Sequence, residues 1–248
     1  MPTCEDEAIC IRHWDYSETS QTVGLFSKHH GLLRAIAKGS RRERAGFSGG
    51  VDLLTHADLV ITLKPDSNLA TLTQWSLRDN FPTIRTEMHA NKIAYFAADT
   101  IGRVLESHDP HPNLFEGFLA LLHTISQHSQ TPQERDIALL EFQWLLLQEA
   151  GYQPTLGTTT IDVEITHFDP RDGGKVCDTQ SATSWKVHTS TISILNHMRD
   201  GGREAQTTTK PEGVRRANRL LAAYLREIIG EEPFTMRRLF GVIPIPTL

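Results

Sequence analysis

Cysteine is scarce in this 248-residue chain, which contains only Cys4, Cys10 and Cys177. Three cysteines cannot all pair, and none stands in a CxxC motif, so a disulfide framework is not expected. A zinc site with four thiolate ligands cannot be built from three cysteines. We therefore expect free thiols in a reducing cytoplasm.

Long hydrophobic runs are also missing. No segment approaches the roughly 18 consecutive apolar residues that a membrane helix needs. The N-terminus, Met1 to Glu7, is acidic and lacks the basic-then-apolar layout of a signal peptide. Since 39% of the residues are hydrophobic, the chain can bury a core, and we expect a folded cytoplasmic protein without membrane association.

Catalytic motifs are absent from the sequence, which has no GxxxxGK[ST] phosphate loop, no HExxH and no GxSxG. The closest of the twelve histidines to one another are His29-His30, His108 to His111 and His123 to His128. None of these groups has a third ligand at a recognisable spacing, so we expect surface histidines, no metal, no cofactor and no enzymatic activity. A metal-dependent hydrolase or nuclease that uses histidine and aspartate remains an alternative.

The net charge of −5 hides a strong segregation of charge along the chain. Residues 11–50 carry seven Lys/Arg against three acids, a net of +4. Residues 51–150 carry six bases against thirteen acids, a net of −7, and residues 213–248 carry six arginines against three glutamates, a net of +3. This asymmetry indicates that the two ends of the chain face a polyanion.

Short β-rich stretches separated by polar or glycine-containing turns fill the first 80 residues. They lie at residues 8–11, 22–26, 32–37, 51–64 and 69–75. Five closely spaced strands without an intervening helical period indicate a small closed barrel of the OB type.

Helical periodicity begins at Pro82. Apolar residues recur at three-, four- or seven-residue steps from Ile84 to Leu105, and further helices are expected near 113–128, 131–151, 187–199 and 212–229. Thr131-Pro132-Gln133-Glu134 is a capping-box start, and Gly151 stands where a left-handed C-terminal residue is expected. The sequence therefore predicts an α+β protein with an OB-fold domain at 1–80 and an α-helical domain at 81–248, which includes an irregular, zinc-less insert around 153–184.

The strongest binding signal is the basic loop that follows the third expected strand. It packs four bases into the seven residues Lys38 to Arg44 and continues with glycines to Gly50. Long cationic side chains on such a loop can reach successive phosphates without a fixed base sequence, although a solvated, solubilising loop is the alternative. The nearby aromatics Trp14, Tyr16, Phe26 and Phe47 are expected to pack in the core or a turn rather than to stack on bases.

Several segments together resemble the RecO family. Trp14 to Ser20 (WDYSETS) is similar to the family's turn between the first two strands, and His30 to Arg41 (HGLLRAIAKGSR) to its strand and basic loop. The segment from Phe142 to Pro154 resembles the central helix that ends in "L-G-Y-x-P", and Arg219 to Phe240 resembles the C-terminal helix and basic end. Their order and spacing agree over most of the chain.

The resemblance implies a recombination mediator of RecF-pathway DNA repair, in the cytoplasm and associated with the nucleoid. Such proteins bind single- and double-stranded DNA and anneal complementary strands without ATP. They associate with RecR and with the C-terminal tail of single-strand binding protein, and so help RecA to load. A different OB-fold protein that binds RNA or another nucleic acid remains the main alternative.

The resemblance also implies DNA contacts at the matching basic positions, which are Arg34, Lys38 and Arg41. Local reasoning extends this patch to four more bases: Arg12, Lys28, Arg42 and Arg44. The basic C-terminal end adds Arg237 and Arg238.

Two features depart from the family pattern. Many members carry four cysteines that form a zinc site after the central helix, whereas Thr155 to Asp178 contains only Cys177, so no zinc is expected here. Relatives also often carry an arginine just before the phenylalanine of the central helix, where this chain has Glu141. We therefore assign the pocket for the partner's acidic tail to Phe142 and the earlier Arg135.

Overall fold

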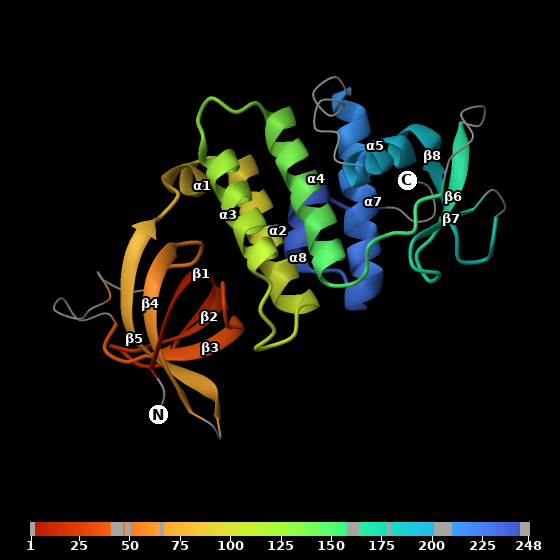
Figure 1. Ribbon diagram of the computed structural model, residues 1–248. Coiled ribbons are helices and arrows are strands. Elements are labelled where there is room, and N and C mark those ends of the chain that lie inside the picture. The colour runs from red at the N-terminus through yellow and green to blue at the C-terminus, as the bar shows by residue number, and fades with distance from the viewer. Residues whose placement is uncertain are drawn as a thin grey trace. The chain divides into compact units, whose positions relative to one another are not determined.

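The computed structural model describes residues 3–40, 47, 51–64, 67–157, 164–177, 180–200 and 210–243 (Figure 1). The chain forms two compact units, Met1–Ser126 and Gln127–Leu248, which we call the barrel unit and the helical unit. The barrel unit is larger than the domain expected at 1–80, because it also contains the first three helices.

Five strands form a closed barrel at the start of the barrel unit (Figure 1). They are β1 (Thr3–Asp15), β2 (Gln21–Ser27), β3 (Gly31–Ala37), β4 (His56–Lys64) and β5 (Ser67–Asp79). The order is β1-β2-β3-β5-β4, and the parallel pairing of β3 with β5 and the antiparallel pairing of β4 with β1 close the barrel. The predicted five-stranded OB-type barrel followed by helices is confirmed.

The barrel interior is filled by alternate residues of the strands, because successive side chains of a strand point to opposite faces. Val23 and Leu25 of β2 and Leu59 and Ile61 of β4 are almost completely buried there, together with Trp75 of β5. All of these residues lie in the β-rich stretches from which the strands were predicted.

Three helices follow the barrel in the same unit: α1 (Pro82–Thr86), α2 (Met88–Val104) and α3 (Pro112–Ser126). The outer side of β2 also carries a buried aromatic, Phe26. Its ring lies 5.8 Å from that of Phe115 and 6.5 Å from that of Phe118, both on α3. A second apolar layer therefore joins α3 to the outside of the barrel.

A buried carboxylate, Asp6 of β1, fixes the turn between β2 and β3. Its side chain is completely buried and accepts hydrogen bonds from the Ser27 hydroxyl and the His29 amide, and it contacts the Nδ1 atoms of His29 and His30 at 2.8 Å each. Burial alone would raise the pKa of Asp6, but the hydrogen bonds from Ser27, His30 and His29 outweigh it and lower that pKa to about 2.

Gly31 closes the same turn with a positive φ of 66°. A Cβ atom at this position would lie 2.2 Å from the backbone oxygen of Asp109, so glycine is required both by the backbone and by space. The turn therefore sits directly against the loop between α2 and α3.

The helical unit is built around α4 (Pro132–Glu149) and α7 (Pro211–Ile229). The predicted capping box is confirmed, since the Thr131 side chain accepts from the Glu134 amide while the Glu134 side chain accepts from the Thr131 amide. Gly151 has the predicted left-handed conformation, with a φ of 78°. Buried Gln143 of α4 donates a 2.7 Å hydrogen bond to Asn218 of α7, which ties the two helices together.

The unit also contains a small antiparallel sheet of order β7-β6-β8, formed by β6 (Ile165–Asp169), β7 (Lys175–Cys177) and β8 (Trp185–His188). The sequence predicted a mostly irregular insert here with a possible strand at 161–165, of which 161–163 lie outside the described residues. Helices α5 (Thr189–Arg199) and α8 (Phe234–Phe240) complete the unit. The start predicted at 187 for the fourth long helix was two residues early, because Val187 and His188 belong to β8.

Asp169, at the end of β6, anchors the residues that precede β8, in the segment where the sequence predicts no zinc. Its carboxylate accepts hydrogen bonds from the hydroxyls of Thr183 at 2.6 Å and Ser181 at 2.8 Å. In the described part of the chain, no three His, Cys, Asp or Glu side chains come together as a metal site. The donors present, hydroxyls around one carboxylate and a single Cys177, do not fit a thiolate zinc centre.

No helix in the described ranges is long and apolar enough to cross a membrane.

The Asp6 cluster predicts a specific dependence of stability on pH. Because the folded-state pKa of Asp6 lies below its ordinary value of 3.8, its stabilisation is present above about pH 4 and is lost as the pH falls toward 2. The Asp6→Asn variant should unfold more easily at pH 7 by roughly 1–2 kcal/mol and should lose less stability than the parent between pH 5 and pH 2.5.

Denaturant unfolding at a series of pH values measures this difference. Asp52→Asn, at an exposed position, is the matched control and should leave the pH profile unchanged. Parallel profiles for the parent and Asp6→Asn would contradict the assignment.

Candidate nucleic-acid interface

Two arginines and a glycine form a row across three neighbouring strands of the barrel. Arg12 of β1 pairs with Gly24 of β2, and Gly24 pairs with Arg34 of β3. Opposite residues of antiparallel strands project on the same face, so both guanidinium groups lie on the outside of the barrel. Gly24 has no side chain to separate them, and a Cβ there would lie 3.2 Å from the Cβ of Arg12.

An exposed indole lies beside this row. Trp14, two residues after Arg12 on β1, is 45% exposed, and the Arg34 guanidinium carbon lies 5.8 Å from the centroid of its ring. Tyr16, in the turn after β1, is 66% exposed. Phe26 and Phe47 are buried, in agreement with the expected core packing, whereas Trp14 and Tyr16 are exposed and do not belong to the core.

Arg12 has a partner on α2. Its Nη2 atom lies 2.9 Å from the Asp99 carboxylate, which also accepts a 2.8 Å hydrogen bond from Arg103. This pair joins the barrel to α2 and directs the Arg12 guanidinium toward that helix. An ion pair of this partly exposed kind contributes only about 0.2–1 kcal/mol, so a phosphate can compete for the arginine.

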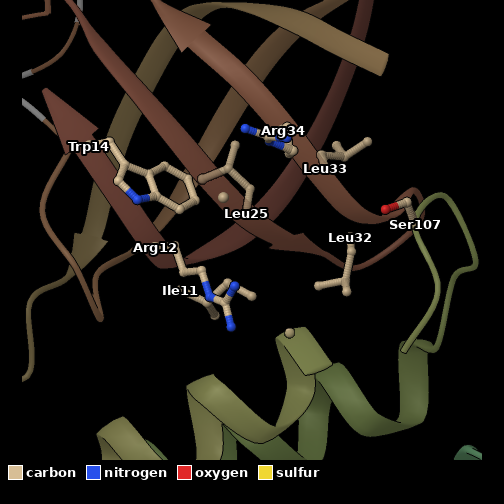
Figure 2. A pocket seen from close by; sticks show the side chains of 10 residues that line it. Ile11, Arg12, Trp14, Leu25, Leu32, Leu33, Arg34 and Ser107 are labelled. Carbon is tan, nitrogen blue, oxygen red and sulfur yellow. The ribbon is translucent and has the colours of Figure 1, made fainter. Parts of the chain in front are cut away.

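A cavity of about 290 Å³ opens between the row and the end of α2. Its lining consists of Ile11, Arg12, Trp14, Gly24, Leu25, Leu32, Leu33, Arg34, Gly102 and Ser107. Figure 2 shows Trp14 and Arg34 on the strands at one side, and Arg12 directed toward the helix at the other. A second cavity of about 380 Å³ adjoins Arg12 and includes Asp99 and Arg103.

The other predicted DNA contacts of the barrel unit are Lys38, the three arginines that follow it, and Lys28. Lys38 is exposed just after β3, and within the described ranges neither it nor Arg34 forms an ion pair. Arg41, Arg42 and Arg44 lie outside the described residues.

Lys28, unlike Lys38 and Arg34, forms ion pairs with two carboxylates. Its Nζ atom lies 2.7 Å from Glu7 and 2.6 Å from Glu116, and these contacts raise the pKa of Lys28. Glu7 also contacts His56 and Arg78. A phosphate could reach Lys28 only by competing with this network.

The predicted C-terminal contacts belong to α8 of the helical unit. Arg237 donates to Glu232 at 2.8 Å, and Glu232 also accepts from Arg226. Arg238 lies over the exposed ring of Phe234, 5.7 Å from its centroid. Of the two, Arg238 is the more available to a phosphate.

The predicted partner-binding residues are buried in the helical unit. Arg135 is 6% exposed and Phe142 is 2% exposed, both on α4. An acidic tail could not contact these side chains directly without rearrangement, so any role in partner binding would be to support a neighbouring surface.

The arrangement on β1, β2 and β3 suits a polynucleotide. Arginine binds phosphate oxygens through its planar fork, and exposed aromatic rings stack on unpaired bases without regard to sequence. Sequence reasoning missed Trp14 as part of this site. The available signal was its spacing of two residues from Arg12, which places both side chains on the same face of a strand.

Comparisons with known proteins identify the family of this chain. The family model described as "Recombination protein O N terminal" matches residues 1–81, and the one described as "Recombination protein O C terminal" matches residues 85–238. A protein of Rhodopirellula baltica named DNA repair protein RecO is 28% identical over 200 residues, which cover 78% of this chain and 73% of the relative.

Two further proteins of the same name align over most of their length. The one from Roseiflexus sp. is 27% identical and covers 92% of this chain and 81% of the relative. The one from Anaeromyxobacter sp. is 25% identical and covers 96% of each. Because the two family models together match nearly the whole sequence, the chain belongs to the RecO family of DNA-repair recombination proteins.

Proposed function

We propose that this protein is a recombination mediator that binds single- and double-stranded DNA on the β1–β3 face of its barrel and anneals complementary strands without ATP. The observation that carries the proposal is the row of Arg12, Gly24 and Arg34 with the exposed Trp14 beside it. Lys38 continues the basic face at the end of β3. Arg41, Arg42 and Arg44, which lie outside the described residues, follow directly in the sequence and add to the same basic segment.

The proposed activity is electrostatic and non-enzymatic. Neutralising phosphates releases their condensed counterions, which favours binding and lets two strands approach each other. Exposed aromatic rings hold unpaired bases open for pairing. Neither step needs a bound nucleotide or metal.

The family relationship supports the rest of the proposal. The protein would act in the cytoplasm at the nucleoid, together with RecR, and would help RecA to load on DNA coated by single-strand binding protein. The helical unit would supply the surface for these proteins, including the acidic C-terminal tail of single-strand binding protein. Arg238 and Phe234 of α8 are exposed and have the chemistry to contact such a tail.

Charge reversal on the barrel face tests DNA binding. Arg34→Glu and Lys38→Glu should each weaken binding of a single-stranded oligonucleotide about tenfold or more at low salt. Each should also reduce the slope of log K against log salt by about 0.7, because one phosphate contact is lost. Fluorescence anisotropy at several salt concentrations measures both quantities.

Lys186→Glu, an equal charge change at an exposed position of the helical unit, is the control and should have a much smaller effect. An unchanged salt slope in the barrel variants would contradict the proposed interface. Competition with RNA of the same length, together with an annealing assay, separates this proposal from an RNA-binding function.

The pairing of Arg12 with Asp99 predicts a gain of affinity. Asp99→Asn removes the carboxylate that competes with phosphate, so DNA affinity should rise about two- to fivefold at low salt, and the salt slope should steepen. The double variant Arg12→Gln/Asp99→Asn should lose this gain. If the gain persisted without Arg12, the ion pair would not be its cause.

A further inference from the structure

Two glycines line the cavity of about 290 Å³ between the arginine row and α2, and their lack of side chains leaves this cavity open. Gly24 lies on its strand side and Gly102 on its helix side. Neither glycine has a positive φ, so the backbone conformation does not require glycine at either position. A side chain at Gly102 would start 3.4 Å from the Arg12 Nη2 atom and would extend into the cavity.

The walls of this cavity combine an apolar floor with planar polar groups. The outward-facing side chain of Leu32 and the nearby Ile11 form the apolar floor, whereas the side chains of Leu25 and Leu33, whose strands border the cavity, turn into the barrel interior. The guanidinium groups of Arg12 and Arg34 and the indole of Trp14 stand around the opening (Figure 2). An apolar floor with a few convergent donors is the usual composition of a site for a small planar ligand.

We propose that this cavity holds one unstacked nucleobase of single-stranded DNA, with the base against the apolar floor and Trp14. Arg12 and Arg34 would then contact the edge of the base or its flanking phosphates. The volume of about 290 Å³ lies just below the range of roughly 300–1,000 Å³ for small-molecule sites. It suits one ring system rather than a longer stretch of chain.

The inference rests on the proposed function. It adds that the cavity lets the protein bind single-stranded DNA more tightly than duplex DNA. A base in a duplex is paired and stacked, so it reaches such a cavity only after it has been extruded, whereas a base in a single strand is already accessible. The basic face binds phosphates of either form, and the cavity adds affinity for the single strand alone. During annealing, the held base must leave the cavity before it can pair.

Gly102→Leu tests the cavity without removing a charge. Two single strands with the same number of phosphates serve as probes, one intact and one abasic at its central positions. The parent protein should bind the intact strand about 5- to 100-fold more tightly than the abasic strand, and Gly102→Leu should abolish this preference. Gly102→Ala, which leaves most of the space open, should retain it.

Intrinsic fluorescence gives an independent readout. Trp75, Trp144 and Trp185 are at most 6% exposed, so Trp14 is the tryptophan that a bound base can reach. The intact strand should quench the emission more than the abasic strand does, and Trp14→Phe should remove this difference. If Gly102→Leu did not fold, Trp14→Ala at its exposed position would replace it in the binding assay.

The outcomes separate this inference from the proposed function. Equal affinity of the parent for intact and abasic strands would overturn the base site while leaving the basic interface in place. An equal loss of affinity for both strands in Gly102→Leu would also overturn it, because the substitution would then act through Arg12 alone. If the parent bound neither strand, the proposed function itself would fail.

Discussion

Backbone pairing across β1, β2 and β3 is the constraint that creates the candidate site, because it places Gly24 between Arg12 and Arg34. A slip of one residue in β1 or in β3 would turn its arginine into the barrel, and a slip of one residue in β2 would bring Val23 out to solvent. The apolar interior therefore fixes the register, and the register fixes where the two positive charges stand. DNA binding in this account depends on the barrel core as much as on the exposed side chains.

The rest of the barrel unit keeps this face in place. The buried Asp6 carboxylate secures the turn that leads into β3, and Phe26 joins the barrel to α3. Asp99 of α2, in the same unit, forms an ion pair with Arg12. The face is thus preorganised for the proposed DNA binding, which reduces the conformational entropy lost on binding. The net charge of −5 does not oppose this function, because binding responds to the local field of the face rather than to the sum over the chain.

The features that could be predicted from the sequence are those set by neighbouring residues, namely the strands of the barrel and the ends of helices. The barrel strands followed from short β-rich stretches bounded by turn residues, and the start of α4 followed from its capping box. Contacts between distant residues were not predictable in this way. Asp99 lies 87 residues from Arg12, and Glu116 reaches Lys28 from α3, so neither pairing leaves a trace in the neighbouring sequence. The exposure of Trp14 likewise depends on which side of the closed barrel receives the helices.

Amide hydrogen exchange with and without a single-stranded oligonucleotide tests the central claim most directly. Bound DNA should slow exchange in residues 12–16, 22–24 and 34–38, which form the face around the arginine row. It should leave unchanged β4, which pairs with residues 3–9 of β1 and is not part of this face. Protection confined to the helical unit, with no change on β1, β2 and β3, would contradict the account.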